Sequence, residues 1–164
     1  MALCPLRPEA IAVRLVRQDE RESFIAMALR SWLDAHDKLL TGAEVADAPA
    51  MLERAWAKRW REFRVAETQS ALVGFYSLGD PGDAEENNYL WHLYVDPPWQ
   101  RRGVGTALNR AALEEIAARG AARAWLDVLA KNAKARAFYR ALGWREIGPD
   151  LEEPGLILMD IATR

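Results

Sequence analysis

The stretch "VDPPWQRRGVGTALNRAALEEIAARG", Val95–Gly120, decides the fold of this chain. It begins at the end of an apolar strand pattern, turns at two prolines and continues as a run with helical spacing. Arg101 and Arg102 precede Gly103 and Gly105, where the helix begins. Free N–H groups at the start of a helix attract anions, and glycines let a ligand approach the backbone. The stretch therefore predicts a strand, a phosphate-binding loop and a helix in succession.

Length and composition indicate one ordinary globular domain over residues 1–164. Hydrophobic residues make up 51% of the chain and charged residues 28%, with a formal net charge of -2. This balance favours neither a nucleic-acid partner nor an anionic membrane. No run reaches the ~18 apolar residues of a membrane span. We therefore expect no nucleic-acid partner and no membrane partner.

The single cysteine, Cys4, cannot form a disulfide within the chain. No Cys/His cluster accompanies it, so neither a metal site nor a catalytic thiol is expected there. The start, "MALCPLRPEA", lacks the apolar stretch of a signal peptide. The expected location is therefore the cytoplasm.

Hydrophobic periodicity outside the opening stretch predicts one α/β domain around a central sheet. Strands are expected at 11–16, 62–67, 71–78, 89–95, 122–129, 144–148 and 155–162. Helices are expected from a cap at Asp19 to about 30–33, over 50–60, over 103–119, and from a cap at Asn132 to 142. Residues 37–49 are interpreted as a loop. In the strand over 89–95, alternation places Trp91 with Leu93 on one face and His92 on the other.

Two well-known phosphate loops compete for the glycine stretch. The P-loop requires a lysine after its last glycine, and none follows here, which excludes it. The dinucleotide fingerprint G-x-G-x-x-G requires a third glycine where this chain has Leu108. Asp127 stands on the next strand, about where a ribose-binding acid belongs. A dinucleotide-binding protein is therefore retained as an alternative.

Two motifs resemble those of the GNAT superfamily of N-acetyltransferases. "QRRGVGTAL" (100–108) is similar to its Q/R-x-x-G-x-G/A motif, and "LDVLAKNAKARAFYRALGWRE" (126–146) to its N-x-x-A-x-x-F-Y-x-x-x-G-[FW] segment. The resemblance extends over about residues 11–161, because the element order also matches. It implies the acyl-CoA N-acyltransferase fold, an α/β fold of the α+β type. That fold has a mixed, mostly antiparallel sheet of about seven strands flanked by four helices.

The resemblance also implies which residues bind acetyl-CoA. Main-chain groups of Leu93, Tyr94 and Val95 would contact the pantetheine arm, and a backbone N–H there would stabilise the oxyanion. The pyrophosphate would be held by the amides of Arg101, Arg102, Gly103, Val104, Gly105 and Thr106. Asn132 would reach the cofactor arm in addition to capping its helix. No metal is implied.

The implied reaction is direct acetyl transfer to a primary amine in a ternary complex, since neither motif contains a cysteine. Tyr139 matches the family's tyrosine near the thioester sulfur and is the expected general acid. His92, Glu67, Glu85 and Glu86 are candidate bases, and the sequence assigns that role to none of them.

The acceptor is expected to be a small amine, an amino acid derivative or a protein N-terminus. Trp32, His36 and Trp91 are the candidate acceptor-binding residues. A catalytically silent acyl-CoA-binding or regulatory module is the alternative that gains from the missing base. A homodimer is consistent with the resemblance, because dimers are common in the family.

Overall fold

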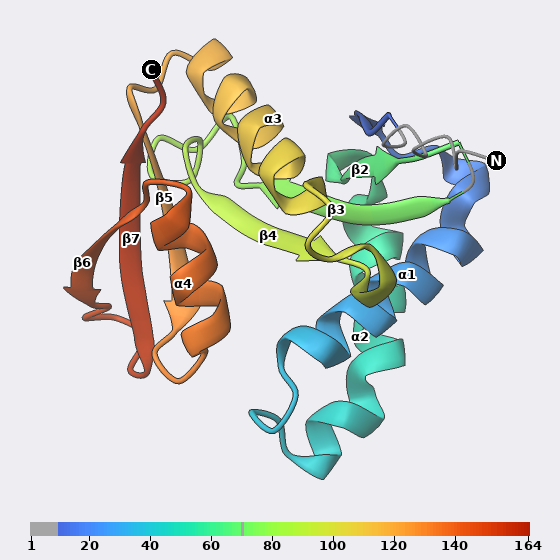
Figure 1. Ribbon diagram of the computed structural model, residues 1–164. Coiled ribbons are helices and arrows are strands. Elements are labelled where there is room, and N and C mark those ends of the chain that lie inside the picture. Colours follow the sequence, from blue (N-terminus) through green and yellow to red (C-terminus); the bar gives the residue numbers. More distant parts are fainter. Residues whose placement is uncertain (1–9, 70) are drawn as a thin grey trace, which may run out of the picture.

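The computed structural model describes residues 10–69 and 71–164, so Cys4 lies outside the described part (Figure 1). The strands are β1 (Ala12–Leu15), β2 (Arg64–Glu67), β3 (Leu72–Leu78), β4 (Leu90–Val95), β5 (Arg123–Leu129), β6 (Arg145–Pro149) and β7 (Leu156–Ala162). The helices are α1 (Arg21–Ala35), α2 (Gly42–Arg59), α3 (Val104–Ala118) and α4 (Ala133–Ala141). Short 3-10 turns are η1 (Gln18–Glu20), η2 (Trp60–Glu62) and η3 (Pro97–Trp99). The predicted order of strands and helices is confirmed.

The strands form two antiparallel sheets with the orders β1-β2-β3-β4 and β5-β7-β6. Among the described residues, an isolated parallel bridge between Tyr89 and Trp125 joins β4 to β5. The Trp125 N–H also donates to the Asn88 carbonyl at 3.0 Å. The expected mixed, mostly antiparallel arrangement of seven strands is therefore present, but it opens between β4 and β5.

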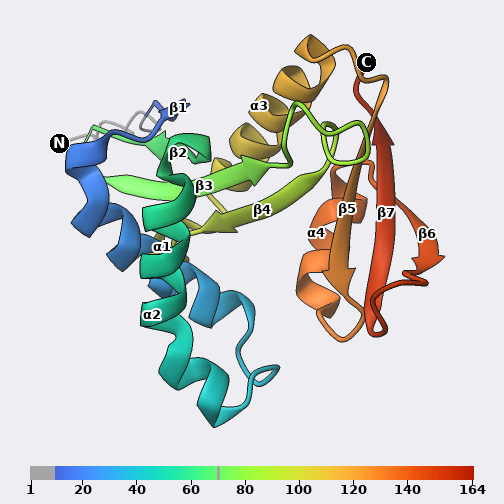
Figure 2. The ribbon, with the colours of Figure 1, turned by 180° about the vertical axis from the view of Figure 1, so that it is seen from behind.

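Helices cover the two sheets unequally. In Figure 1, α3 and α4 lie in front of the strands, and in the reverse view of Figure 2 both lie behind them. Helices α1 and α2 cover the other face of β1–β4, where Phe24 and Trp56 pack against Phe75 in one buried cluster. Figure 2 shows β5, β7 and β6 without a helix over the face turned to the viewer. One face of the three-stranded sheet is thus open beside the gap.

The core between the sheets and α3 follows the predicted helical row. Val104, Leu108, Ala112 and Ile116 are each at most 1% exposed. They pack with Leu126 of β5 and its neighbours in a second buried cluster. An apolar residue every four positions places one stripe of the helix on the sheet, so this helix was well predicted.

Two helix starts differ from the sequence prediction. Asp19 lies inside η1, and Glu20 occupies the N-cap position of α1 without a side-chain cap bond. Helix α2 begins at Gly42, within the expected loop and eight residues before the expected start, and Pro49 lies inside it. The Thr41 hydroxyl caps α2 by accepting a hydrogen bond from the Glu44 N–H at 3.3 Å. In return, the Glu44 carboxylate accepts a hydrogen bond from the Thr41 N–H. Proline supplies no N–H and weakens the helix locally, but the capping box fixes the start upstream of it.

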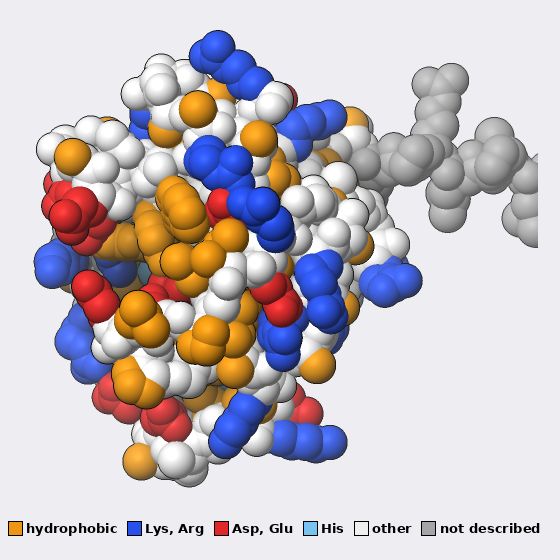
Figure 3. Space-filling view, turned by 90° about the vertical axis from the view of Figure 1, so that its left-hand side faces the viewer, with side chains coloured by type: hydrophobic (Ala, Val, Ile, Leu, Met, Phe, Trp, Pro, Cys, Tyr) orange, Lys and Arg blue, Asp and Glu red, His pale blue; other side chains and the backbone are white. Residues whose placement is uncertain are grey.

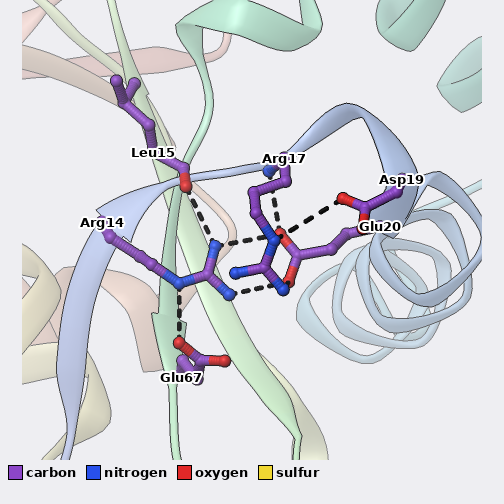
Figure 4. A network of polar contacts seen from close by, with 6 residues as sticks. All are labelled: Arg14, Leu15, Arg17, Asp19, Glu20 and Glu67. Atoms are coloured by element: carbon purple, nitrogen blue, oxygen red, sulfur yellow. Dashed lines mark hydrogen bonds and ion pairs between the residues drawn. The ribbon is translucent and has the colours of Figure 1, made fainter.

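An ion network fastens the N-terminal strand to the hairpin (Figure 4). Arg14 donates to Glu20 at 2.7 Å and to Glu67 at 2.6 Å, and Arg17 pairs with Glu20 at 2.7 Å. Hydrogen bonding from Arg14 lowers the pKa of both Glu20 and Glu67. Glu67, a candidate base in the sequence, is therefore committed to a structural ion pair two strands away from β4.

The face assignment of Trp91 was wrong. The register of β3 and β4 shifts after the pair Ser77–His92, so that Leu78 lies opposite Leu90 and Trp91 is the extra residue of a bulge. Leu90 consequently packs in the same cluster as Leu93. The Trp91 ring lies instead under the guanidinium of Arg59 of α2, 4.6 Å from its centroid. A single inserted residue reverses strand alternation, which composition does not reveal.

Replacing Leu108 by alanine should lower the free energy of unfolding by about 2–5 kcal/mol, because the cavity forms in a fully enclosed site. Leu108 is 0% exposed, whereas Leu151 is 96% exposed, so Leu151→Ala is the matched control. The control should change stability by less than about 0.5 kcal/mol. Urea denaturation of both variants measures the difference. Equal losses would contradict the assigned core.

Candidate functional site

The loop between β4 and α3 offers a row of backbone N–H groups. Arg101 and Gly103 have positive φ angles of 63° and 84°, and Gly103 is the N-cap of α3 with no side-chain cap bond. The first helical bond runs from the Ala107 N–H to the Gly103 carbonyl. Within the described residues, no acceptor is found for the N–H groups from 101 to 106. This end of α3 can therefore bind an anion such as a phosphate.

The two glycines serve different purposes. A Cβ on Gly103 would meet nothing within 4 Å, so no close contact requires a glycine there. Its positive φ angle favours glycine, and the open space leaves the backbone accessible to a ligand. A Cβ on Gly105 would lie 2.9 Å from the Phe138 ring of α4. Gly105 therefore permits close packing of α3 on α4, in addition to backbone exposure.

The edge of β4 that faces β5 carries free backbone groups. The Asp96 N–H donates to the Val73 carbonyl at 2.9 Å, which makes this pair hydrogen-bonded in the antiparallel ladder. Because bonded and non-bonded pairs alternate, Tyr94 is bonded to Phe75, while the N–H and C=O groups of Leu93 and Val95 point away from β3. The Val95 carbonyl accepts a hydrogen bond from the Gln100 side-chain amide at 3.4 Å, which is possible because this carbonyl points away from β3.

Tyr139 comes from α4 and borders the gap on the side of α3. Its ring packs against Phe138 and Trp144, with centroids 5.2 and 5.8 Å away. No hydrogen bond to a described residue is found for its hydroxyl. Burial, and secondarily the nearby Tyr94, raise the pKa of Tyr139 above the ordinary tyrosine value. Tyr139 therefore stays protonated at neutral pH and is free to donate.

The C-terminal end of α1 approaches β4 through aromatic contacts. The ring of His36 lies 4.9 Å from Trp32 and 6.0 Å from Tyr94. The Nδ1 atom of His36 is 2.8 Å from the Trp32 carbonyl, which fixes the imidazole at the helix end. Burial raises the pKa of Tyr94 to about 12. Two of the three predicted acceptor residues thus pack on each other, and one of them, His36, also contacts Tyr94.

Polar contacts join α1, the loop and α4 across the gap. The Asn132 side chain accepts from the Ala135 N–H at 3.0 Å, as expected of a cap, and also donates to the Ala35 carbonyl at 3.2 Å. Gln100 donates to Asp34 at 2.8 Å and accepts from Lys134 at 3.0 Å. These bonds hold the ends of α1 and α4 close to the anion-binding loop.

Trp91 and His92 lie toward Arg59 of α2, and the His92 ring is also 6.2 Å from the Tyr94 ring. His92 Nδ1 is 2.7 Å from the Ser77 hydroxyl, and burial together with Arg59 lowers the pKa of His92 to about 4. An imidazole with this pKa is neutral at pH 7 and is a weak proton acceptor. His92 is therefore a packed histidine, and no longer a good candidate for a base.

Asp127 is a carboxylate that the sequence analysis did not include among the candidate bases. Tyr89 donates a hydrogen bond to its Oδ2 atom, and the neighbouring Asp150 carboxyl group shares a hydrogen bond with Asp127 when Asp127 is protonated. Burial, followed by the charge of Asp150, raises the pKa of Asp127. The only signal in the sequence was a carboxylate between apolar neighbours, Leu126 and Val128, and it suggested a ribose contact.

Asp127 lies on the open face of β5, on the side opposite α3. Ala124, Leu126 and Val128 of the same strand pack toward α3 and α4 in the core, and alternation turns Asp127 the other way. This placement removes the reason for the dinucleotide alternative, because a ribose-binding acid must face the same ligand as the glycine loop. Instead, Asp127 and Tyr139 border the gap from opposite faces.

Charge is unevenly distributed around the gap. Seen from the side of β6 and β7, basic side chains lie mainly toward α3 and α4 on the right, and acidic side chains mainly on the left (Figure 3). The described residues contain no group of His, Cys, Asp or Glu that could hold a metal ion. No helix of the described part is long and apolar enough to cross a membrane.

Comparison with known proteins identifies the relatives of this chain. Residues 17–144 match the model of the "Acetyltransferase (GNAT) family". The [ribosomal protein bS18]-alanine N-acetyltransferase of Escherichia coli K12 is 33% identical over 119 residues, which cover 65% of this chain and 80% of that protein.

Solved structures of the same fold agree. PaiA N-acetyltransferase from Thermoplasma acidophilum, in complex with coenzyme A, superposes with a TM-score of 0.75 at 20% identity, covering 93% of this chain and 99% of that one. The ribosomal-protein-S18-alanine N-acetyltransferase from Escherichia coli gives a TM-score of 0.64 at 19% identity, covering 94% of each chain.

Replacing Gly105 by alanine should destabilise the protein by about 1–3 kcal/mol, because the new methyl group overlaps the Phe138 ring. Introducing the change into a Phe138→Leu background should reduce the loss, since the smaller side chain leaves room. Gly42→Ala is the matched control: its Cβ would meet nothing within 4 Å. Thermal unfolding of these variants tests the contact. A loss of the same size in the Phe138→Leu background would refute it.

Proposed function

The chain belongs to the GNAT family and is an acetyl-CoA-dependent N-acetyltransferase, and we propose that Asp127 and Tyr139 serve its reaction as base and acid. The observation that carries the proposal is their placement on opposite faces of β5, beside the gap. An amine that enters from the open face meets Asp127. Groups that enter from the side of α3 meet Tyr139.

The described residues fit acetyl-CoA. The unpaired N–H groups from 101 to 106, with Arg101 and Arg102 beside them, suit a pyrophosphate. The Leu93 backbone groups and the Val95 N–H, which point away from β3, suit the amides of a pantetheine arm, and Asn132 would join them by exchanging its bond to Ala35. When bound, acetyl-CoA supplies a thioester whose acetyl group passes to the amine. The remaining steps belong to side chains of this protein.

Asp127 would remove the proton from the acceptor. An amine is mostly protonated at pH 7 and must lose a proton before it attacks. The raised pKa of Asp127 brings the carboxyl group closer to working pH, and the Tyr89 hydroxyl holds its Oδ2 atom in place. A proton accepted by Asp127 would be shared in a hydrogen bond with the neighbouring Asp150 carboxylate.

Tyr139 would protonate the departing thiolate, since its hydroxyl is unpaired among the described residues. A backbone N–H of Leu93 or Val95 would stabilise the negative charge that develops on the acetyl oxygen. The acid and the base act on different partners, so both can be in place at once.

The acceptor is a primary amine, of a protein or of a small molecule. The curated relative acts on an alanine of ribosomal protein bS18, which favours a protein amine. Trp32 and His36, gathered at Tyr94, would contact the acceptor. Trp91 also remains a proposed acceptor contact. Because its ring turns toward α2, it would contact only an acceptor that reaches the far end of the open face.

A panel of amines and peptides incubated with acetyl-CoA tests the proposal, with thiol release as the readout. Thermal-shift measurements with acetyl-CoA and with NAD accompany it. Protection by acetyl-CoA together with acetylation of at least one amine is expected. Protection without acetylation of any member would favour a silent acyl-CoA-binding module instead.

Replacing Tyr139 by phenylalanine should lower kcat by about a hundredfold or more, the usual contribution of a general acid. The Kd for coenzyme A should stay nearly unchanged, because the ring that packs on Phe138 and Trp144 is retained. Steady-state kinetics and calorimetry measure the two quantities. An unchanged kcat would remove the acid role.

Replacing Asp127 by asparagine should lower kcat/KM by about a hundredfold, because the amide accepts no proton. In the wild-type enzyme kcat/KM should rise with pH as Asp127 ionises, with an apparent pKa above the ordinary aspartate value of ~3.9. The variant should lose this acidic limb. Persistence of the limb in Asp127→Asn would assign it to another group.

A further inference from the structure

One side of α1 holds the turn that precedes the anion-binding loop. The guanidinium of Arg30 donates two hydrogen bonds, at 3.0 and 2.8 Å, to the two carboxylate oxygens of Asp96. One helical turn later, Asp34 accepts a hydrogen bond from the Gln100 side-chain amide at 2.8 Å. Residues four apart lie on the same side of a helix, so α1 holds both ends of the segment 96–100.

The segment between these two contacts is a stiff turn. Pro97 and Pro98 have fixed φ angles. The Asp96 carbonyl accepts a hydrogen bond from the Trp99 N–H at 2.8 Å, which closes the turn. A displacement of Asp96 would therefore be passed on to the N–H groups from 101 to 106 that follow.

Asp96 depends on Arg30 for its charged partner. Its side chain is 6% exposed, and Arg30 is the sole cation in the described part of the chain that forms an ion pair with it. A buried carboxylate that loses its charged partner is costly, so the place of Asp96 follows the place of the guanidinium. The Arg30 side chain is 54% exposed and lines a cavity of about 450 Å³ beside Ser23 and Met27. Solvent therefore reaches the pair from the arginine side.

Arg21 of the same helix forms an ion pair of a different kind. Its partner is Glu53 of α2, and both side chains are exposed, at 48% and 44%. An exposed pair of this kind contributes little to stability and fixes little in place. It joins α1 to α2, and it leads to no part of the anion-binding loop.

We propose that Arg30 is a positioning residue for acetyl-CoA binding. By holding Asp96 with two hydrogen bonds, it places the turn 97–99 and the N–H groups from 101 to 106 where the pyrophosphate requires them. Asp34 supports the far end of the turn through Gln100. The proposal rests on the cofactor contacts proposed above. It adds that α1, which contributes no residue to the anion-binding loop, controls the affinity of that loop.

Replacing Arg30 by alanine should raise the Kd for coenzyme A by about tenfold, because a misplacement on the order of 1 Å is costly in a preorganised site. At saturating acetyl-CoA, kcat should change by less than about twofold, since Asp127 and Tyr139 come from β5 and α4. Arg21→Ala is the matched control and should leave the Kd within about twofold of the wild type. Calorimetry and steady-state kinetics measure the two quantities.

Two further measurements separate positioning from a loss of stability. Arg30→Lys keeps a positive charge beside Asp96 but cannot form the same pair of hydrogen bonds. Thermal stability should therefore recover in Arg30→Lys, whereas the Kd should stay raised. Guanidinium chloride, far below denaturing concentrations, should lower the Kd of Arg30→Ala and leave the wild type unchanged, because the ion can enter the exposed place of the missing side chain. Sodium chloride at the same concentration is the control.

Equal Kd values in Arg30→Ala and Arg21→Ala would overturn the proposal, and so would full recovery of the Kd by lysine. Arg102→Ala shows separately whether the loop binds the cofactor. A raised Kd in Arg102→Ala but not in Arg30→Ala would refute only the positioning role. An unchanged Kd in both would refute the anion site and the positioning role together.

Discussion

The interruption of hydrogen bonding between β4 and β5 is the constraint on which the site depends. The bridge from Tyr89 to Trp125 holds the strands together at one end, and beyond it each strand pairs only with its outer neighbour. Unpaired backbone groups at a sheet edge are costly when buried and useful when a ligand completes them. The groups of Leu93 and the N–H group of Val95 are the ones we propose to meet the amide-containing arm of acetyl-CoA.

The same gap separates two chemical environments. On one side lie the start of α3, the arginines before it and Tyr139. On the other lies an open sheet face with Asp127, close to the carboxyl groups of Asp150 and Glu153. A cofactor rich in phosphate suits the first side, and a cationic amine suits the second. The proposed donor and acceptor would thus approach the gap from faces of opposite charge.

Polar contacts between segments that are distant in the sequence position the helix ends around the gap. Arg30 of α1 makes two bonds to the buried Asp96, at 3.0 and 2.8 Å, directly after β4. Asn132 reaches from the cap of α4 to the end of α1. Removing Arg30 would leave the buried Asp96 carboxylate without its charged partner, whereas the exposed Arg30 is solvated with or without Asp96. The helix ends around the gap are therefore positioned by polar contacts and the strands by their ladders.

The sequence by itself determined the order of elements, the buried row of α3, the cap at Asn132 and the glycine loop, because these depend on local periodicity and local backbone conformation. The two motifs also identified the family and the cofactor. Only the tertiary structure decided the face of Trp91, through a bulge, and the surroundings of Asp127, through pairing with strands distant in the chain. Register and burial arise from contacts between remote segments, so only they could place Asp127 beside Tyr89 on the open face.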